Sequence, residues 1–168
     1  MFLALVTLFT GSISSEASAK EGEFGLTLAV GTGYVLGKSV NDATGDSMIS
    51  GRNPTLLDLD FQYEILSWLA PSLRAEIALE GGGALTLVPG VVFDSDGDKV
   101  TFYGRFGVAI RLEPTWIGVD IGAGMIWHFL EHLGLVTEIN VEPLFIGKDL
   151  TGGAVVPMLF LFGLRGNI

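Results

Sequence analysis

Charged side chains recur at every second position along several segments of this chain. Arg74 and Glu76, for example, alternate with Leu73, Ala75 and Ile77. Carboxylates and guanidinium groups that share one face could pair with each other, or they could line a narrow path for cations. Which of these two functions applies depends on the secondary-structure elements that position the charged residues.

The residues that follow this alternation form one candidate set: Asp58, Asp60, Glu64, Arg74, Glu76, Glu80, Arg105, Arg111, Asp120, Glu138 and Glu142. Acids outnumber arginines in this set. We expect a structural network of ion pairs and hydrogen bonds, because an unpaired charge is costly in a narrow interior. A gated cation pathway is the alternative.

Two further patterns offer weaker chemistry. The run Asp94-Ser95-Asp96-Gly97-Asp98 has the oxygen density of a calcium loop, but Tyr103 stands where the full pattern needs a bidentate Glu. We interpret it as a solvated acidic turn and leave calcium binding open. Gly31-x-Gly33 and Gly81-Gly82-Gly83 lack the strand-to-helix context of a dinucleotide site. We therefore assign no cofactor.

The composition limits which elements can position these residues. The 168 residues suit one domain, 49% are hydrophobic, and the mean hydropathy is +0.53. After residue 20 no apolar run approaches the ~20 residues of a membrane helix. The net charge of -10 argues against a nucleic-acid partner, and the absence of cysteine excludes a disulfide scaffold.

The first 19 residues are typical of an export signal. The apolar run Phe2 to Phe9 leads to Ala17-Ser18-Ala19, an A-x-A cleavage pattern, and polar Lys20 follows. No Lys or Arg precedes the apolar run. We predict a cleaved signal at 1–19 and a mature domain at 20–168, with an uncleaved anchor as the alternative.

Eight strand-like segments follow, separated by turn residues. They span 24–36, 55–66, 72–81, 84–93, 99–112, 115–129, 133–146 and 154–165. A long connector at 37–54, rich in Gly, Ser, Asn and Asp, is predicted as a surface loop. The reversals near 68–71, 94–98 and 131–132 are shorter and fall at the opposite end.

Each strand sorts its side chains into an oily and a polar set. In 99–112 one face carries Val100, Phe102, Phe106, Val108, Ile110 and Leu112, and the other carries Thr101, Tyr103, Arg105, Ala109 and Arg111. An Arg that faces lipid near the midplane costs roughly 2–4 kcal/mol, so the charged faces must turn inward together. Unpaired strand edges in lipid are also costly, so the first and last strands must pair.

The pattern therefore predicts an all-β, eight-stranded, antiparallel up-and-down transmembrane β-barrel. Small residues on the inner face of the first strand leave room for long neighbours: Gly25, Ala29, Gly31 and Gly33. Aromatic residues cluster at the short-turn end, as an interfacial girdle requires: Phe61, Tyr63, Trp68, Phe93, Phe102, Trp127 and Phe129.

The mature chain resembles the small OmpA/OmpX-type outer-membrane barrels of the porin family. The resemblance includes WLAPSLRAE at 68–76 and LEHLGLVTE at 130–138, each a turn that leads into a strand. It implies a bacterial outer-membrane location and outer-membrane lipids as surroundings. The last strand resembles the signal read by the barrel-assembly machinery, with Met158, Phe160, Phe162, Leu164 and Ile168 at alternate positions, although the family usually ends in an aromatic residue.

We expect a monomeric, non-enzymatic integral membrane protein with a structural or surface-interaction role and a lumen filled by charged side chains. A small ion or solute channel is one alternative, and a lipid-modifying enzyme is another. Lipid A deacylases of similar size use His-x-Ser, but Phe129 and Leu130 follow His128 here. The spacing of His128 and His132 would join them on a helix but not in a strand and turn, so we predict no metal site.

Overall fold

The computed structural model describes residues 22–41, 45–81, 83–95, 97–147, 150 and 153–168. The predicted export signal at 1–19 lies outside these residues. No helix long and apolar enough to cross a membrane occurs in the described part of the chain.

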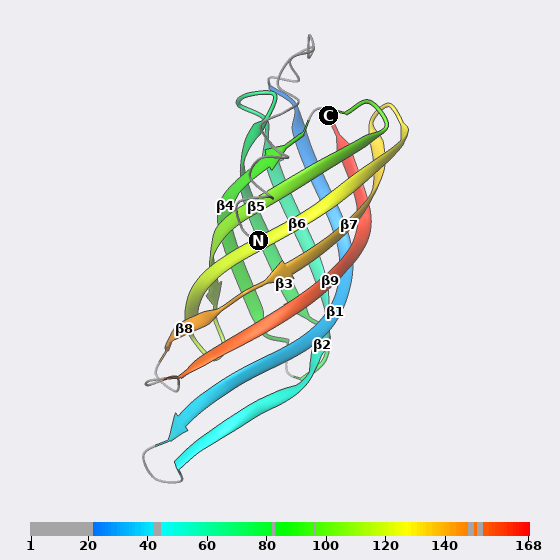
Figure 1. Cartoon of the computed structure of the whole chain (residues 1–168). Coiled ribbons are helices and arrows are strands. Elements are labelled where there is room, and N and C mark those ends of the chain that lie inside the picture. The colour runs from blue at the N-terminus through cyan, green and yellow to red at the C-terminus, as the bar shows by residue number, and fades with distance from the viewer. Residues whose placement is uncertain (1–21, 42–44, 82, 96, 148–149, 151–152) are drawn as a thin grey trace, which may run out of the picture.

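The described chain is built from antiparallel strands in sequence order (Figure 1). Their bounds are β1 Phe24–Asn41, β2 Gly45–Tyr63, β3 Leu69–Ala78, β4 Leu85–Asp94, β5 Val100–Arg111, β6 Trp116–Leu130, β7 Leu133–Val141, β8 Leu144–Gly147 and β9 Ala154–Asn167. The segments β7 and β8 share one place in the wall, because both pair with β6 on one side and β9 on the other. Pro143, which has no N–H to donate, lies between them.

The barrel is closed by the first and last strands. β1 and β9 pair from Gly25↔Asn167 to Lys38↔Ala154, so both ends of the sheet find a partner. The result is an eight-stranded antiparallel barrel, which confirms the predicted fold class. Closure matters because a free edge in lipid would leave backbone polar groups unpaired.

The connector at 37–54 differs from its prediction as a loop. β1 and β2 remain paired through Gly37↔Ile49 and Lys38↔Met48 to Asn41↔Gly45, so the loop prediction is wrong for this backbone. Glycine, serine and asparagine suggested a loop, but the neighbouring ladder to β9 extends the pairing as far as Lys38. The hairpin extends beyond the other strands at the lower end of the barrel (Figure 1).

The sorting of side chains into two faces is confirmed. Phe106 is 51% exposed on the outside of β5, whereas its neighbour Arg105 is 3% exposed and faces inward. The outward positions of β1, β2, β6 and β9 are also large and apolar, and they include Leu28, Phe61, Ile121 and Phe162. An apolar exterior over a charged interior suits a protein surrounded by acyl chains.

Aromatic side chains gather at the end of the barrel where the chain ends meet. Trp68 stacks on Phe93 with ring centroids 6.3 Å apart, and Trp127 lies 6.4 Å from Phe129. The backbone N–H of Phe24 donates to the carbonyl of Ile168 at the same end. The predicted clustering of aromatic residues at the short-turn end is therefore confirmed.

The seam between β1 and β9 depends on a glycine. A Cβ on Gly33 would overlap the backbone carbonyl of Met158, so we expect Gly33→Ala to lower the free energy of unfolding by about 1–3 kcal/mol through overpacking. Gly51 has open space around its Cβ position, so Gly51→Ala should change it by less than about 0.5 kcal/mol. Urea titrations in lipid vesicles measure both, and equal midpoints would contradict this role of Gly33.

Candidate functional site in the barrel interior

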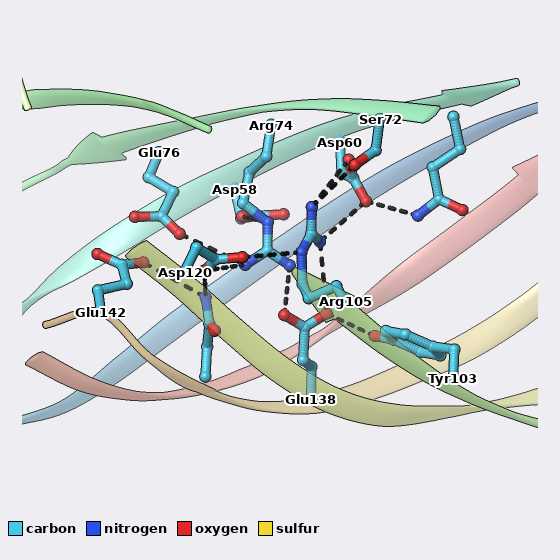
Figure 2. A network of polar contacts seen from close by, with 12 residues as sticks. Asp58, Asp60, Ser72, Arg74, Glu76, Tyr103, Arg105, Asp120, Glu138 and Glu142 are labelled. Carbon is cyan, nitrogen blue, oxygen red and sulfur yellow. Dashed lines mark hydrogen bonds and ion pairs between the residues drawn. The ribbon is translucent and has the colours of Figure 1, made fainter. Parts of the chain in front are cut away.

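The centre of the lumen is organised around Arg74, which β3 holds at 1% exposure. Its guanidinium contacts the carboxylates of Asp58 at 3.0 Å and Glu76 at 3.5 Å, and it also pairs with Glu138. A fourth carboxylate, from Asp120, lies 4.0 Å away. These side chains come from β2, β3, β6 and β7 and converge on one another, as Figure 2 shows.

A second arginine, Arg105 from β5, continues the network toward the girdle end. It pairs with Asp60 at 3.1 Å, Asp120 at 3.2 Å and Glu138 at 3.7 Å. Asp120 and Glu138 therefore lie between both guanidinium groups (Figure 2). The structure brings together eight members of the predicted set: Asp58, Asp60, Arg74, Glu76, Arg105, Asp120, Glu138 and Glu142.

Neutral side chains complete the network, and the candidate set missed them. The Tyr103 hydroxyl donates to Glu138 at 2.6 Å, and the Gln62 amide donates to Asp60 at 2.6 Å. The Asn140 amide donates to Asp120 and, at 3.3 Å, to Glu142. These three residues could have been predicted from their positions on the inner face of their strands, but the candidate set included charged residues only. Each of these hydrogen bonds gives a buried carboxylate a donor from the protein in place of water.

Glycines on β6 make space for these long side chains. A Cβ on Gly122 would lie 2.8 Å from Arg105 Cγ, and one on Gly124 would lie 2.6 Å from the Tyr103 hydroxyl. Gly25 on β1 plays the same part for Arg165, whose guanidinium would lie 2.9 Å from an added Cβ. The expectation that small inner residues accommodate large neighbours is thus confirmed at Gly25.

A separate ion pair lies nearer the girdle end. Arg165 of β9 pairs with Glu64, the residue that follows β2, at 3.3 Å, and both side chains are buried. The candidate set contained Glu64 but not its partner. Alternation along β9 places Phe162 and Leu164 outward, so Arg165 could have been found as the inward residue at that end.

Besides Glu64, two members of the candidate set, Glu80 and Arg111, do not join the network. Glu80 follows the end of β3, where Gly81 and Gly83 adopt positive φ and stop the alternation, so its side chain is exposed. It pairs outside the lumen with Arg52 at 3.0 Å. Arg111 faces inward, but its guanidinium lies over the Trp116 ring at 5.4 Å rather than on an acid. Predictions for these two residues were wrong.

The pKa of Glu80 lies below its ordinary value, mainly because the Thr55 hydroxyl donates to it at 2.7 Å, with Arg52 adding to the effect. A lowered pKa means that this contact stabilises the fold above the unfolded pKa and is lost as the pH falls through the lower, folded pKa. We expect a carboxyl NMR titration to place Glu80 below an unstructured Glu. Thr55→Ala should move it upward, and no movement would contradict the assignment.

Apolar side chains fill the lumen on both sides of the charged layer. One buried cluster, toward the girdle end, comprises Ala70, Val92, Tyr103, Ile126 and Val136. Another, toward the opposite end, comprises Val88, Ala109, Leu144, Leu150 and Val155. Between them Asp120 and Asn140 have no exposed surface. A lumen of eight strands is just wide enough to be filled in this way.

His128 lies beside a threonine of β5. His128 Nε2 lies 3.0 Å from Thr101 Oγ1, which itself donates to the Gly97 carbonyl at 3.2 Å. Thr101 has one hydroxyl proton, so the Gly97 carbonyl competes with His128 for it. Within the described residues no group of three or more acidic or histidine side chains could hold a metal ion. In the acidic turn, Asp96 lies outside the described residues.

Comparisons with known proteins find similar solved structures but no matching sequence. No protein-family model matches the chain, and no curated protein matches it. The outer membrane protein OprG from Pseudomonas aeruginosa has a TM-score of 0.65 at 15% identity, over 89% of this chain and 97% of that one. The N-terminal β-barrel domain of OprF from the same organism has a TM-score of 0.63 at 12% identity, over 88% and 98%.

A third solved structure, Neisserial surface protein A, has a TM-score of 0.58 at 13% identity over 87% of this chain and 99% of that one. Each of these proteins is matched over nearly its full length. Together with the closed sheet and the apolar exterior, the likeness identifies the fold. The chain has the fold of the small eight-stranded outer-membrane β-barrels.

Proposed function

We propose that this chain is a monomeric, non-catalytic integral protein of the bacterial outer membrane whose lumen does not conduct. Its role is structural, or it presents a surface at the outer face, and barrel-assembly machinery inserts it. The location is supported by the fold shared with outer-membrane proteins and by the apolar outer wall. The observation that most strongly supports a non-conducting, structural role is the filled lumen, in which Arg74 is 1% exposed and Asp120 is 0% exposed.

The filled lumen opposes conduction for an electrostatic reason as well as a steric one. A cation that entered would have to displace Arg74 from Asp58 or Arg105 from Asp60, and among the described ion pairs each of these two carboxylates has a single arginine partner. Removing one partner from a buried, paired charge costs about 3–5 kcal/mol. The surplus of carboxylates would select cations if the layer opened, so a cation channel is the form that the alternative would take.

Single-channel recording on refolded protein in planar bilayers separates these functions. We expect no discrete conductance steps under conditions in which a general porin, reconstituted in parallel, gives them. Regular steps with cation selectivity would overturn the non-conducting role and leave the barrel fold intact. Heat-modifiable mobility on gels establishes first that the refolded protein is a closed barrel.

The enzyme alternative needs a nucleophile with a base in reach. The Thr101 and His128 pair is the nearest arrangement among the described polar contacts, and the Gly97 carbonyl competes with His128 for the single hydroxyl proton of Thr101. We expect labelled lipopolysaccharide to keep its acyl chains after incubation with the folded protein. Release of labelled fatty acid, abolished by His128→Ala, would establish the enzyme instead.

A further inference from the structure

The outward face of the β1–β2 hairpin continues the apolar wall of the barrel beyond the ends of the neighbouring strands. We infer that this face lies on the membrane surface, at the boundary between acyl chains and headgroups, and not free in water. The inference rests on the proposed membrane location and adds a second lipid contact to it. The exposed positions that carry it are Tyr34, Leu36, Met48, Ser50 and Arg52.

The first argument is continuity with the lipid-facing wall. Along β1 the outward residues Leu26, Leu28 and Val30 lead through Thr32 to Tyr34 and Leu36 without a change of phase. Tyr34 and Leu36 pair with Met158 and Val156 of β9, so the wall runs directly into this part of the hairpin. β2 makes its last pair with β3 at Leu56↔Ala78, whereas β1 stays paired with β9 as far as Lys38↔Ala154.

The second argument is a bulge that keeps the hairpin in the same orientation. The register between β1 and β2 shifts between Gly31↔Leu56 and Gly33↔Asn53. On the barrel side of this shift the even-numbered residues of β2, such as Asp58, face inward. On the hairpin side the even-numbered residue Arg52 faces outward. The bulge therefore brings Met48 and Ser50 to the same side as Leu36. Bulges re-aim side chains in this way.

The third argument is the composition of the face. Met48 is 79% exposed, and Tyr34 and Leu36 are 45% and 42% exposed, yet they share the face with the long cation Arg52. Apolar side chains beside tyrosine and snorkelling cations are typical of the headgroup boundary rather than of the acyl core or of bulk water.

The fourth argument is that the hairpin is held at its base. Arg52 donates to Thr32 at 3.4 Å, to Thr55 at 2.7 Å and to Glu80 at 3.0 Å. These contacts tie the outward face of β2 to β1 and to the turn after β3. The orientation of the apolar side chains toward the membrane is therefore set by the barrel and does not depend on the hairpin tip.

Spin labels test the inference, because the chain contains no cysteine. Single Cys variants at Leu36, Met48 and Ser50 carry a nitroxide in vesicles of phosphatidylethanolamine and phosphatidylglycerol. Phe106→Cys serves as the lipid reference and Glu131→Cys as the water reference. Gly51→Cys is the matched control, because it neighbours Ser50 on the opposite face and has open space at its Cβ position.

We expect labels at 36, 48 and 50 to collide with oxygen severalfold more readily than with a water-soluble nickel chelate, and the label at 51 to favour the chelate. Chelate accessibility at 48 equal to that at 131 would overturn the inference. So would spin–spin broadening at 48 that disappears on dilution with unlabelled protein, since a second copy would then cover the face. Water-like behaviour at 106 would instead reject the proposed membrane location.

Discussion

Arg74→Met is expected to lower the free energy of unfolding by about 3–5 kcal/mol, the typical cost of removing one partner from a buried ion pair. Methionine keeps most of the volume of the arginine but leaves Asp58, Glu76 and Glu138 facing one another without their shared cation. Urea titration in lipid vesicles, followed by the heat-modifiable shift on gels, measures the change.

Two controls separate charge from packing in this experiment. Adding Asp58→Asn to Arg74→Met removes a carboxylate whose described ion pair is with Arg74 alone, so the double variant should recover part of the loss. Arg52→Met breaks an exposed pair with Glu80 and should cost no more than about 1 kcal/mol. If Arg74→Met and Arg52→Met had equal effects, the buried network would not be the main stabilising feature of the lumen.

Phe106→Arg is expected to lower the free energy of unfolding in vesicles by about 2–4 kcal/mol, because it places a charge in the acyl layer. Phe106 is 51% exposed on the outer wall, and it pairs with Ile121 and Val91 in the middle of β5. A soluble protein would accept an arginine at so exposed a position with little change. The measurement is a urea titration of folding in phospholipid vesicles.

Depth provides the control for this prediction. Leu130 is 62% exposed at the end of β6, next to the turn at 131–132, so Leu130→Arg should cost only about 0–1 kcal/mol. The difference between the two variants reports the position of the acyl layer along the wall. Equal and small effects at both positions would show that the exposed apolar face is not in lipid.

The alternation of oily and ionic side chains made most of the fold predictable. Every predicted strand from 55–66 to 154–165 overlaps an observed one, because a period of two identifies both the strand and its lipid face. The hairpin at 37–54 could not be predicted in this way. Its glycine, serine and asparagine residues favour turns locally, whereas the pairing of β1 with β9 keeps the backbone extended.

The site was predictable where a charge lay inside a regular strand. Arg74, Arg105 and Glu138 fall on the inner phase and meet as expected. The prediction for Glu80 was wrong because β3 ends two residues before it, at Ala78. The end of the strand is set by the glycine turn that follows and cannot be found from the alternation of side chains. The prediction for Arg111 was wrong for another reason. Alternation gives the direction in which a side chain points but not the residue that it contacts, and Arg111 contacts the Trp116 ring.

Tryptophan fluorescence tests most directly whether the outer face contacts acyl chains. Trp68 and Trp127 are each 51% exposed on that face, and Trp116→Phe removes the half-buried third tryptophan. In vesicles of phospholipid brominated near the headgroup end of the acyl chain, we predict strong quenching of this variant and little quenching by aqueous iodide. Emission unchanged by brominated lipid but quenched by iodide would contradict the account.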